Sequence, residues 1–263
     1  MSGQQDSVEY FLAAIASVPA DAPTACTGWT AHHVAAHLAA GFEEVNALIA
    51  DFLAGRPSRD TRTFAEREAP FIAMADDALR ERLRGYLSTT RNVLADFRAA
   101  GPDAVFHFNG AAFTSAQMTV HRDGELAIHR WDLLGDDAIG DELLSTPAFT
   151  HHAVFLLNAL PMLAEAATNR VAGTGLRATT VVLRTSGQPD VALDVDADGE
   201  ARFVHGDSEG SITGECVVTT DAANRLLTLW GRHSRHRAVS VTGNPAQWGA
   251  VAAALWPDAP EWG

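Results

Sequence analysis

The sequence has little cysteine and no long apolar run. Its two cysteines, Cys26 and Cys216, lie far apart in 263 residues and form no CxxC motif. We therefore expect no disulfide framework and a reducing, cytoplasmic setting. No uninterrupted apolar run approaches the ~18 residues of a membrane-spanning helix. The N-terminus lacks the basic and apolar regions of a signal peptide, so neither a membrane segment nor a leader is expected.

Basic residues are also few. The chain has 19 Lys and Arg against 33 Asp and Glu, which gives a net charge of −14. This balance argues against nucleic acid and against anionic membrane surfaces as partners, and it says little about small-molecule substrates. The length allows one large domain or two ordinary ones, and the sequence shows no internal repeat.

In the first part of the chain, apolar residues recur every three to four positions, which is typical of amphipathic helices. Thr30 is a predicted N-cap, and Pro161 is expected to kink or split the last of these helices. A long charged connection between residues 55 and 70 is of a kind that is often functional. The predicted helices span residues 4–17, 31–53, 76–99, 118–135 and 141–169.

The apolar pattern changes after residue 173, where short runs rich in β-branched residues alternate with turn residues. This pattern is typical of strands. Helices are predicted from Asp221 to Gly231 and from Asn244 to Trp256. The predicted strands span residues 179–185, 191–197, 201–205, 216–220 and 239–242. The sequence therefore predicts two domains, an all-helical domain at residues 1–172 and a small α+β domain at residues 173–263.

The predicted helix at 118–135 carries two polar stripes at ~100° per residue. One stripe includes Glu125 and His129, which lie one turn apart on the same face. A surface helix needs only one polar face, so one stripe is expected to point inward. Buried carboxylate and imidazole groups are costly unless they are paired or bound to a metal. The stripe therefore indicates a metal site, although an E-x-x-x-H pair is by itself often an exposed polar pair.

A catalytic metal site typically has three protein ligands and one open position. The third ligand must come from another helix, where His33 and His37 are both candidates. Two His and one carboxylate suit zinc, but also iron, nickel or cobalt. Asp132 is either an acceptor for a ligand His N–H or a solvated charge. Arg122 either neutralises a substrate carboxylate or pairs with Glu125.

A basic segment, residues 231–237, follows the predicted helix that starts at Asp221. Cations are common at helix C-termini because they interact favourably with the helix dipole. The alternative is a clamp for an anionic substrate or a thiol cofactor. Arg232 is then the best single candidate, because it follows the helix end directly.

Two motifs resemble the mycothiol-dependent maleylpyruvate isomerase family, within the DinB-like superfamily of metal-binding helical bundles. One is the Gly-Trp-Thr segment that leads to His37-Leu38, and the other is Arg-x-x-Glu-x-x-x-His-Arg-Trp-Asp at residues 122–132. The segment at 226–232 is similar to a small sterol-carrier-like domain that many members carry. The resemblance implies a four-helix bundle followed by a small α+β domain.

The resemblance implies three metal ligands, His37, Glu125 and His129, with zinc as the usual metal and another divalent metal possible. It also implies an essential arginine in the C-terminal domain, which we place on Arg232. Family members commonly have Asp at the position of His33, so this histidine remains a rival ligand. We further assign cofactor binding to Arg122 and Arg232.

The implied function is that of a metal-dependent enzyme that uses mycothiol, a low-molecular-weight thiol, as an isomerase or thiol S-transferase. The thiolate would add to a small electrophilic, maleylpyruvate-like substrate, and rotation and elimination would complete an isomerisation. One alternative is a hydrolase with a metal-bound water, for which Glu44 or Asp132 is the candidate base. The other is a ligand-binding protein without catalysis.

Overall fold

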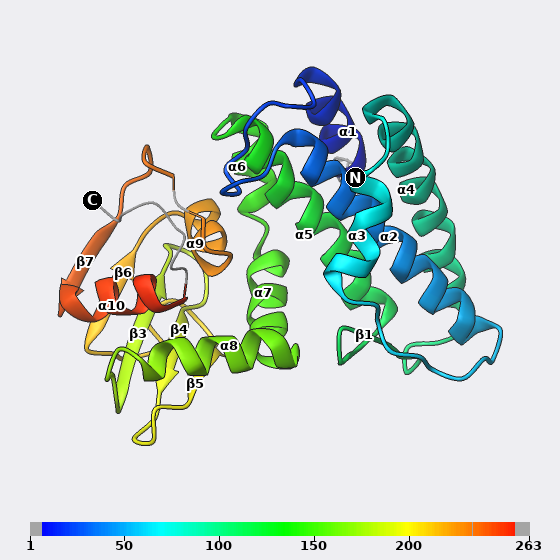
Figure 1. Ribbon diagram of the computed structural model, residues 1–263. Coiled ribbons are helices and arrows are strands. Elements are labelled where there is room, and N and C mark those ends of the chain that lie inside the picture. The colour runs from blue at the N-terminus through cyan, green and yellow to red at the C-terminus, as the bar shows by residue number, and fades with distance from the viewer. Residues whose placement is uncertain (1–6, 233, 256–263) are drawn as a thin grey trace. The chain divides into compact units, whose positions relative to one another are not determined.

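The computed structural model describes residues 7–232 and 234–255 (Figure 1). The chain divides after Gly135 into two units, each with its own core. Among the described residues, no helix is long and apolar enough to cross a membrane. The order of the two units, helical first and sheet-containing second, confirms the predicted fold class.

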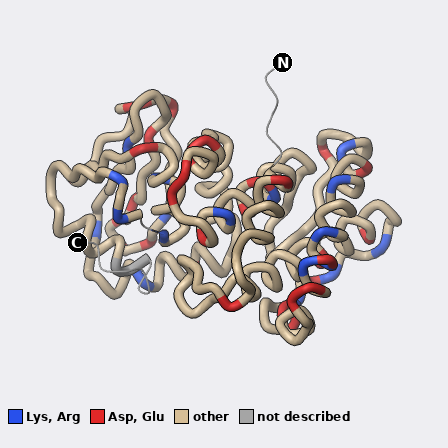
Figure 2. Tube along the Cα trace, turned by 90° about the horizontal axis from the view of Figure 1, so that it is seen from above, with Lys and Arg blue, Asp and Glu red and all other residues tan. Residues whose placement is uncertain are grey.

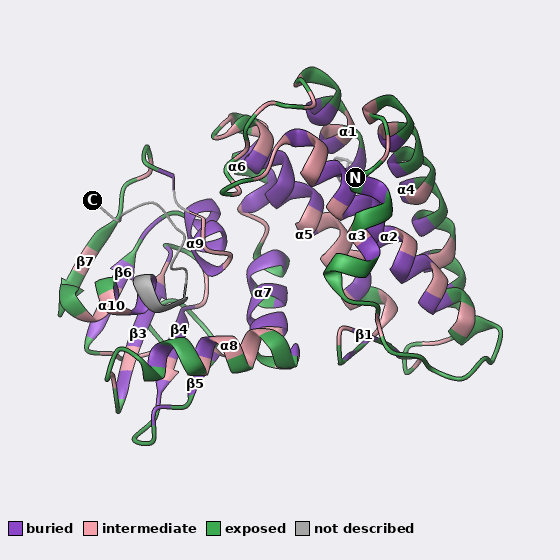
Figure 3. Ribbon diagram, in the orientation of Figure 1, coloured by how far each residue is buried: buried purple, intermediate pink, exposed green. Residues whose placement is uncertain are grey.

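The first unit consists mainly of four long helices. α2 packs against α4, α5 packs against α1 and α4, and the Ala-rich face of α2 is buried along most of its length (Figure 3). Their bounds are α1 (Ser7–Ser17), α2 (Ala31–Leu53), α4 (Asp76–Ala99) and α5 (Ser115–Leu134). These helices confirm the first four predicted ones to within a few residues at each end.

Two elements of the first unit were not predicted. Helix α3 (Phe64–Ile72) packs against α2, and strands β1 (Phe106–Phe108) and β2 (Ala111–Phe113) form a hairpin. α3 is short, begins within the predicted connection and ends just beyond it. A capping box begins it, because Thr63 accepts the backbone N–H of Glu66 at its side chain and donates its own backbone N–H to the Glu66 carboxylate.

The second unit is built on a five-stranded sheet with the strand order β5-β4-β3-β6-β7. β3 and β6 are parallel, and the other neighbours are antiparallel. The strands are β3 (Thr179–Arg184), β4 (Val191–Val195), β5 (Ala201–His205), β6 (Cys216–Thr219) and β7 (Ser240–Gly243). The helices are α6 (Ala138–Leu144), α7 (Pro147–Ala159), α8 (Pro161–Ala172), α9 (Ala222–Leu229) and α10 (Pro245–Leu255).

The division after Gly135 comes earlier than the predicted boundary between residues 172 and 173. The reason is that α7 and α8 pack against edge strand β5. The Asn158 side chain bonds both backbone groups of Phe203, at 2.8 and 2.9 Å, and Thr168 contacts the backbone of Ala201. Helical periodicity places a helix but does not say what it packs against. The predicted split at Pro161 is confirmed, since α8 begins there.

A fully buried carboxylate, Glu44 on α2, holds the connection between α2 and α3. Its oxygens accept from Arg59 Nη1 at 2.6 Å, from Arg62 Nε at 2.8 Å and from the Arg62 backbone N–H at 3.1 Å. Burial alone would raise the pKa of Glu44, but the two guanidinium groups outweigh it and lower the pKa.

Figure 2 shows the charged residues along the chain, and every basic one is arginine because the sequence has no lysine.

We expect Glu44→Gln to lower the free energy of unfolding by about 2 kcal/mol at pH 7, because it weakens the charge-assisted hydrogen bonds of a buried carboxylate to two partly exposed arginines. A carboxyl with a lowered pKa stabilises the fold above its ordinary pKa, and this contribution is lost as the pH falls through the lowered value. The difference from wild type should therefore shrink below about pH 4. Urea unfolding followed by circular dichroism measures both effects. Glu81→Gln, at a side chain that is 78% exposed, is the matched control and should show no change.

Candidate metal centre

Three side chains from α2 and α5 converge at one point in the first unit. His37, Glu125 and His129 each offer a ligand atom, and these atoms all lie within 4.8 Å of one another. Glu125 Oε2 lies 3.8 Å from His37 Nε2 and 3.7 Å from His129 Nε2. These distances exceed a hydrogen bond. They are slightly wider than the ~3.3 Å edge of a tetrahedral zinc site with bonds of about 2.0–2.1 Å. The donor set and its spacing therefore fit a metal ion.

A carboxylate from α3 orients the His37 ring. Glu68 Oε1 lies 2.7 Å from His37 Nδ1, a contact that favours the tautomer with its proton on Nδ1 and leaves the lone pair of Nε2, on the side of Glu125, for a metal. This is the arrangement that metal-binding histidines usually have. Glu68 was missed in the sequence because α3 itself was not predicted, and no spacing in the connection relates it to His37.

A second carboxylate orients His129. Asp132 Oδ2 lies 2.8 Å from His129 Nδ1, so of the two interpretations of Asp132 the structure shows the hydrogen-bond acceptor. Cys26 Sγ lies 3.1 Å from the same oxygen. Cys26, His129 and Asp132 also form a group of possible ligands. Their direct contact leaves no room for an ion between them, so we favour His37, Glu125 and His129 as the ligand set.

Aromatic rings cover the outer sides of the two imidazoles. The Trp29 ring stacks on His129 at 6.4 Å with an interplanar angle of 9°, and it contacts His37 at 5.2 Å. The Phe64 ring stacks on the His37 ring at 6.0 Å. The imidazoles are thus held between apolar surfaces and hydrogen-bonded carboxylates, which fixes their orientation before any ligand binds.

The charges of this centre depend on one another. Burial would raise the pKa of Glu125, but the imidazoles of His129 and His37 hold this pKa well below its usual value. Burial would lower the pKa of His129, but Asp132, Cys26 and Glu125 hold it well above its usual value. Burial lowers the pKa of His121, one turn before Glu125. A neutral His121 and an ionised Glu125 therefore face the site at neutral pH.

Two further sequence candidates have other partners. His33 belongs to the N-terminal cap of α2, where its Nδ1 lies 3.2 Å from the Thr30 backbone nitrogen and 2.9 Å from the Thr30 hydroxyl. It is not part of either ligand group, so its prediction as a rival to His37 is not supported. Glu44, a candidate base for a hydrolase, is bonded to Arg59 and Arg62.

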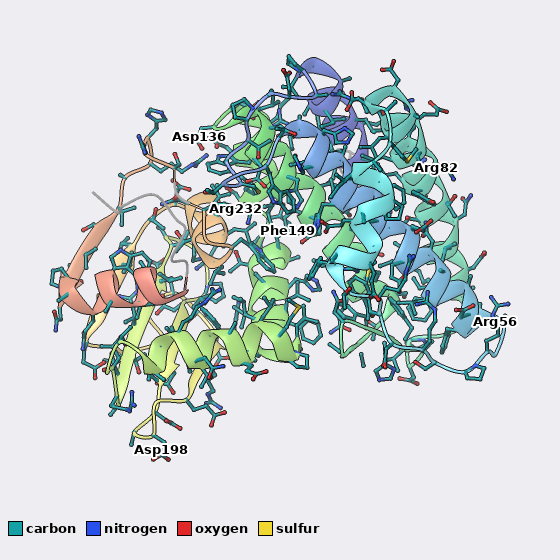
Figure 4. All side chains as sticks on the ribbon, viewed as in Figure 1. Arg56, Arg82, Asp136, Phe149, Asp198 and Arg232 are labelled. Carbon is teal, nitrogen blue, oxygen red and sulfur yellow. The ribbon has the colours of Figure 1, made fainter. Side chains whose placement is uncertain are left out.

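The two predicted arginines lie in different units. The Arg122 guanidinium on α5 pairs with Asp123 at 2.8 Å rather than with Glu125. Arg232 follows α9 in the second unit, where its Nη1 donates to the Trp230 carbonyl at 2.8 Å (Figure 4). In the same basic segment Arg237 pairs with three carboxylates, Asp136, Asp141 and Asp221. Arg237 therefore has a structural role, and Arg232 remains the proposed functional arginine.

In metal-free protein, Asp132→Asn should lower the pKa of His129, because it replaces the carboxylate that stabilises the imidazolium. A raised histidine pKa stabilises the fold below the usual value of about 6.5, and the contribution is lost as the pH rises through the folded-state value. The variant should therefore lose stability mainly at low pH. Titration by nuclear magnetic resonance measures the pKa of His129. Asp103→Asn, at an exposed loop position, is the control, and an unchanged His129 titration in Asp132→Asn would contradict the assignment.

The chain was compared with known families and structures. Residues 4–134 match the family described as mycothiol maleylpyruvate isomerase N-terminal domain, which confirms the predicted resemblance. Crystal structures of the mycothiol-dependent maleylpyruvate isomerase and of a histidine-to-alanine mutant are 16% identical to this chain, each with 90% of both chains covered. Their TM-scores are 0.59 for the former and 0.61 for the mutant, so they share the fold.

The comparison with curated proteins finds no match. The family match ends one residue before the division of the chain into two units and contains all three residues of the ligand set. Over residues 4–134, the chain is therefore a member of the mycothiol maleylpyruvate isomerase N-terminal domain family.

Proposed function

We propose that the protein is a metal-dependent enzyme that uses mycothiol to isomerise, or to conjugate, a small electrophilic substrate resembling maleylpyruvate. The observation that carries the proposal is the convergence of His37, Glu125 and His129 in a domain of this family. The solved relatives with the same fold are titled as mycothiol-dependent maleylpyruvate isomerases. Zinc is the proposed metal, since two imidazoles and a carboxylate are ligands that zinc takes in catalytic sites.

A zinc ion bound here would supply the electrostatic field that deprotonates a thiol at neutral pH. His37 and His129 would hold the ion through Nε2, while Glu68 and Asp132 keep the protons on Nδ1. Glu125 brings a negative charge that partly balances the ion. Trp29 and Phe64 lie against the imidazoles and would help to hold them in place.

The thiolate would add to the activated double bond of the substrate, and the adduct would rotate about the new single bond. Loss of the thiolate then restores the double bond in the other configuration, with no net consumption of thiol. Without that loss, the product is a stable conjugate. Arg122 and Arg232 are the residues that we propose to contact the thiol cofactor, and Arg232 is also the proposed catalytic arginine.

The hydrolase alternative has less support. It needs a base beside a metal-bound water, and the two candidates were Glu44 and Asp132. Glu44 is bonded to two arginines, and Asp132 accepts from His129 and lies against Cys26. Neither carboxylate is available to take a proton from water without losing these contacts.

The first test is the metal content of the purified protein. Wild type should hold about one zinc or other divalent ion per chain, and His37→Ala, Glu125→Ala and His129→Ala should each lose it while circular dichroism shows an intact fold. His107→Ala, at an exposed histidine of β1, is the control and should keep the metal. Activity is then assayed with and without mycothiol on maleylpyruvate. The proposal would be contradicted if the wild type held no metal even after incubation with zinc. It would also be contradicted if the reaction rate were the same with and without mycothiol.

Glu68→Gln tests the orienting contact separately from the ligands. Loss of the carboxylate should weaken metal affinity roughly 10- to 100-fold, as is typical for partners of ligand histidines. Competition with a chelator measures the affinity. Glu66→Gln, two residues earlier on the same helix, alters only its cap and should leave the affinity unchanged. Equal affinities in wild type and Glu68→Gln would show that the contact with His37 is incidental.

A further inference from the structure

Arg67 on α3 is a buried cation, and no described residue forms an ion pair with it. The residue is only 3% exposed. Its Nε and Nη1 atoms are buried and have no hydrogen-bond partner, and none of the described carboxylates forms an ion pair with it. A buried charge is costly unless it is paired and hydrogen-bonded. Such a group calls for an explanation in terms of something that binds to it.

The nearby carboxylates are already engaged. Glu44 and Glu68 are the acidic groups whose charges act on Arg67. Glu44 is bonded to Arg59 and Arg62, and Glu68 is bonded to His37 at 2.7 Å. Burial consequently lowers the pKa of Arg67 despite these two charges. Within residues 7–232 and 234–255, this guanidinium therefore has no carboxylate in direct contact.

Aromatic contacts connect Arg67 to the metal centre. Its guanidinium carbon lies 4.6 Å from the centroid of the Phe64 ring, and this ring also stacks on the ligand His37. It lies 5.7 Å from the Phe108 ring, which in turn contacts His121 at 6.0 Å. His121 precedes the ligand Glu125 by one turn of α5. The Phe64 ring therefore lies between Arg67 and His37, and the rings of Phe108 and His121 lie between Arg67 and the turn of α5 that carries Glu125.

We propose that Arg67 binds a carboxylate of the substrate and thereby selects small electrophiles that carry a carboxylate next to the reactive double bond. A guanidinium presents a planar fork that matches a carboxylate in a bidentate contact, and the contact is strong where water is excluded. The bound anion supplies the missing counter-charge. Arg122, considered for such a role on sequence grounds, already pairs with Asp123. The inference rests on the proposed function for the reaction, but not for the binding of the anion.

The test compares Arg67→Met with Arg84→Met, an arginine of α4 whose side chain is 57% exposed. Maleate, a small dicarboxylate, is the binding probe in isothermal titration calorimetry. We expect Arg67→Met to weaken maleate binding roughly 10- to 100-fold. Because the variant removes an uncompensated buried charge, its melting temperature should stay the same or rise. Arg84→Met should match wild type in both measurements.

The reaction provides an independent readout. With mycothiol, Arg67→Met should slow addition to maleate by a similar factor and leave addition to dimethyl maleate, which has no free carboxylate, nearly unchanged. Equal losses with acid and ester, or maleate affinity equal to wild type, would overturn the inference. If wild type shows no thiol-dependent reaction but binds maleate through Arg67, the proposed function is wrong and the anion site is still supported.

If Arg67→Met does not fold, Arg67→Lys is the alternative variant, because it keeps the charge but lacks the planar guanidinium. Maleate affinity equal to wild type in Arg67→Lys would also overturn the inference.

Discussion

The hydrogen bonds between carboxylates and imidazoles are the constraint on which the first unit depends. Each histidine of the ligand set is held at Nδ1 by a carboxylate, His37 by Glu68 and His129 by Asp132. The two Nε2 atoms therefore face Glu125, and this orientation exists without a metal. The Ala-rich, buried face of α2 lets that helix pack closely, so packed helices rather than a loop carry the proposed ligands.

Charged side chains buried in the first unit differ in how many of their polar atoms have hydrogen-bond partners. Glu44 has strong partners for both oxygens, and this compensation suits a residue that fixes a connection. Arg67, on the helix that follows, has aromatic neighbours but no acceptor for two of its nitrogens. Natural proteins tolerate such local deficits chiefly where they serve function. This contrast is what separates Glu44, which holds the connection between α2 and α3, from Arg67, which we propose to bind an anion.

Much of the fold follows from periodicity. The apolar spacing of α2, α4 and α5 and the alternation of β3 to β7 predict these elements closely, because each buries one face of its own. The Glu125–His129 pair was also predictable, since its spacing leaves a polar stripe inside a helical bundle, whereas the choice of His37 over His33 as the third proposed ligand came from the family resemblance. Periodicity does not reveal tertiary partners. The contact of Glu68 with His37 and the packing of α7 and α8 on β5 therefore required the structure.

The short helix α3 has a consequence for how this protein can diverge. It carries Glu68, which serves the metal ligand, and Arg67 and Phe64, which lie beside it, while Thr63 and Glu66 fix its start. The proposed ligands themselves lie on α2 and α5. Under the proposed function, substrate selection and metal binding therefore depend on different segments, apart from Glu68. Substitutions at positions 64 and 67 of this nine-residue helix could then change the substrate while the three proposed ligands and Glu68 are retained.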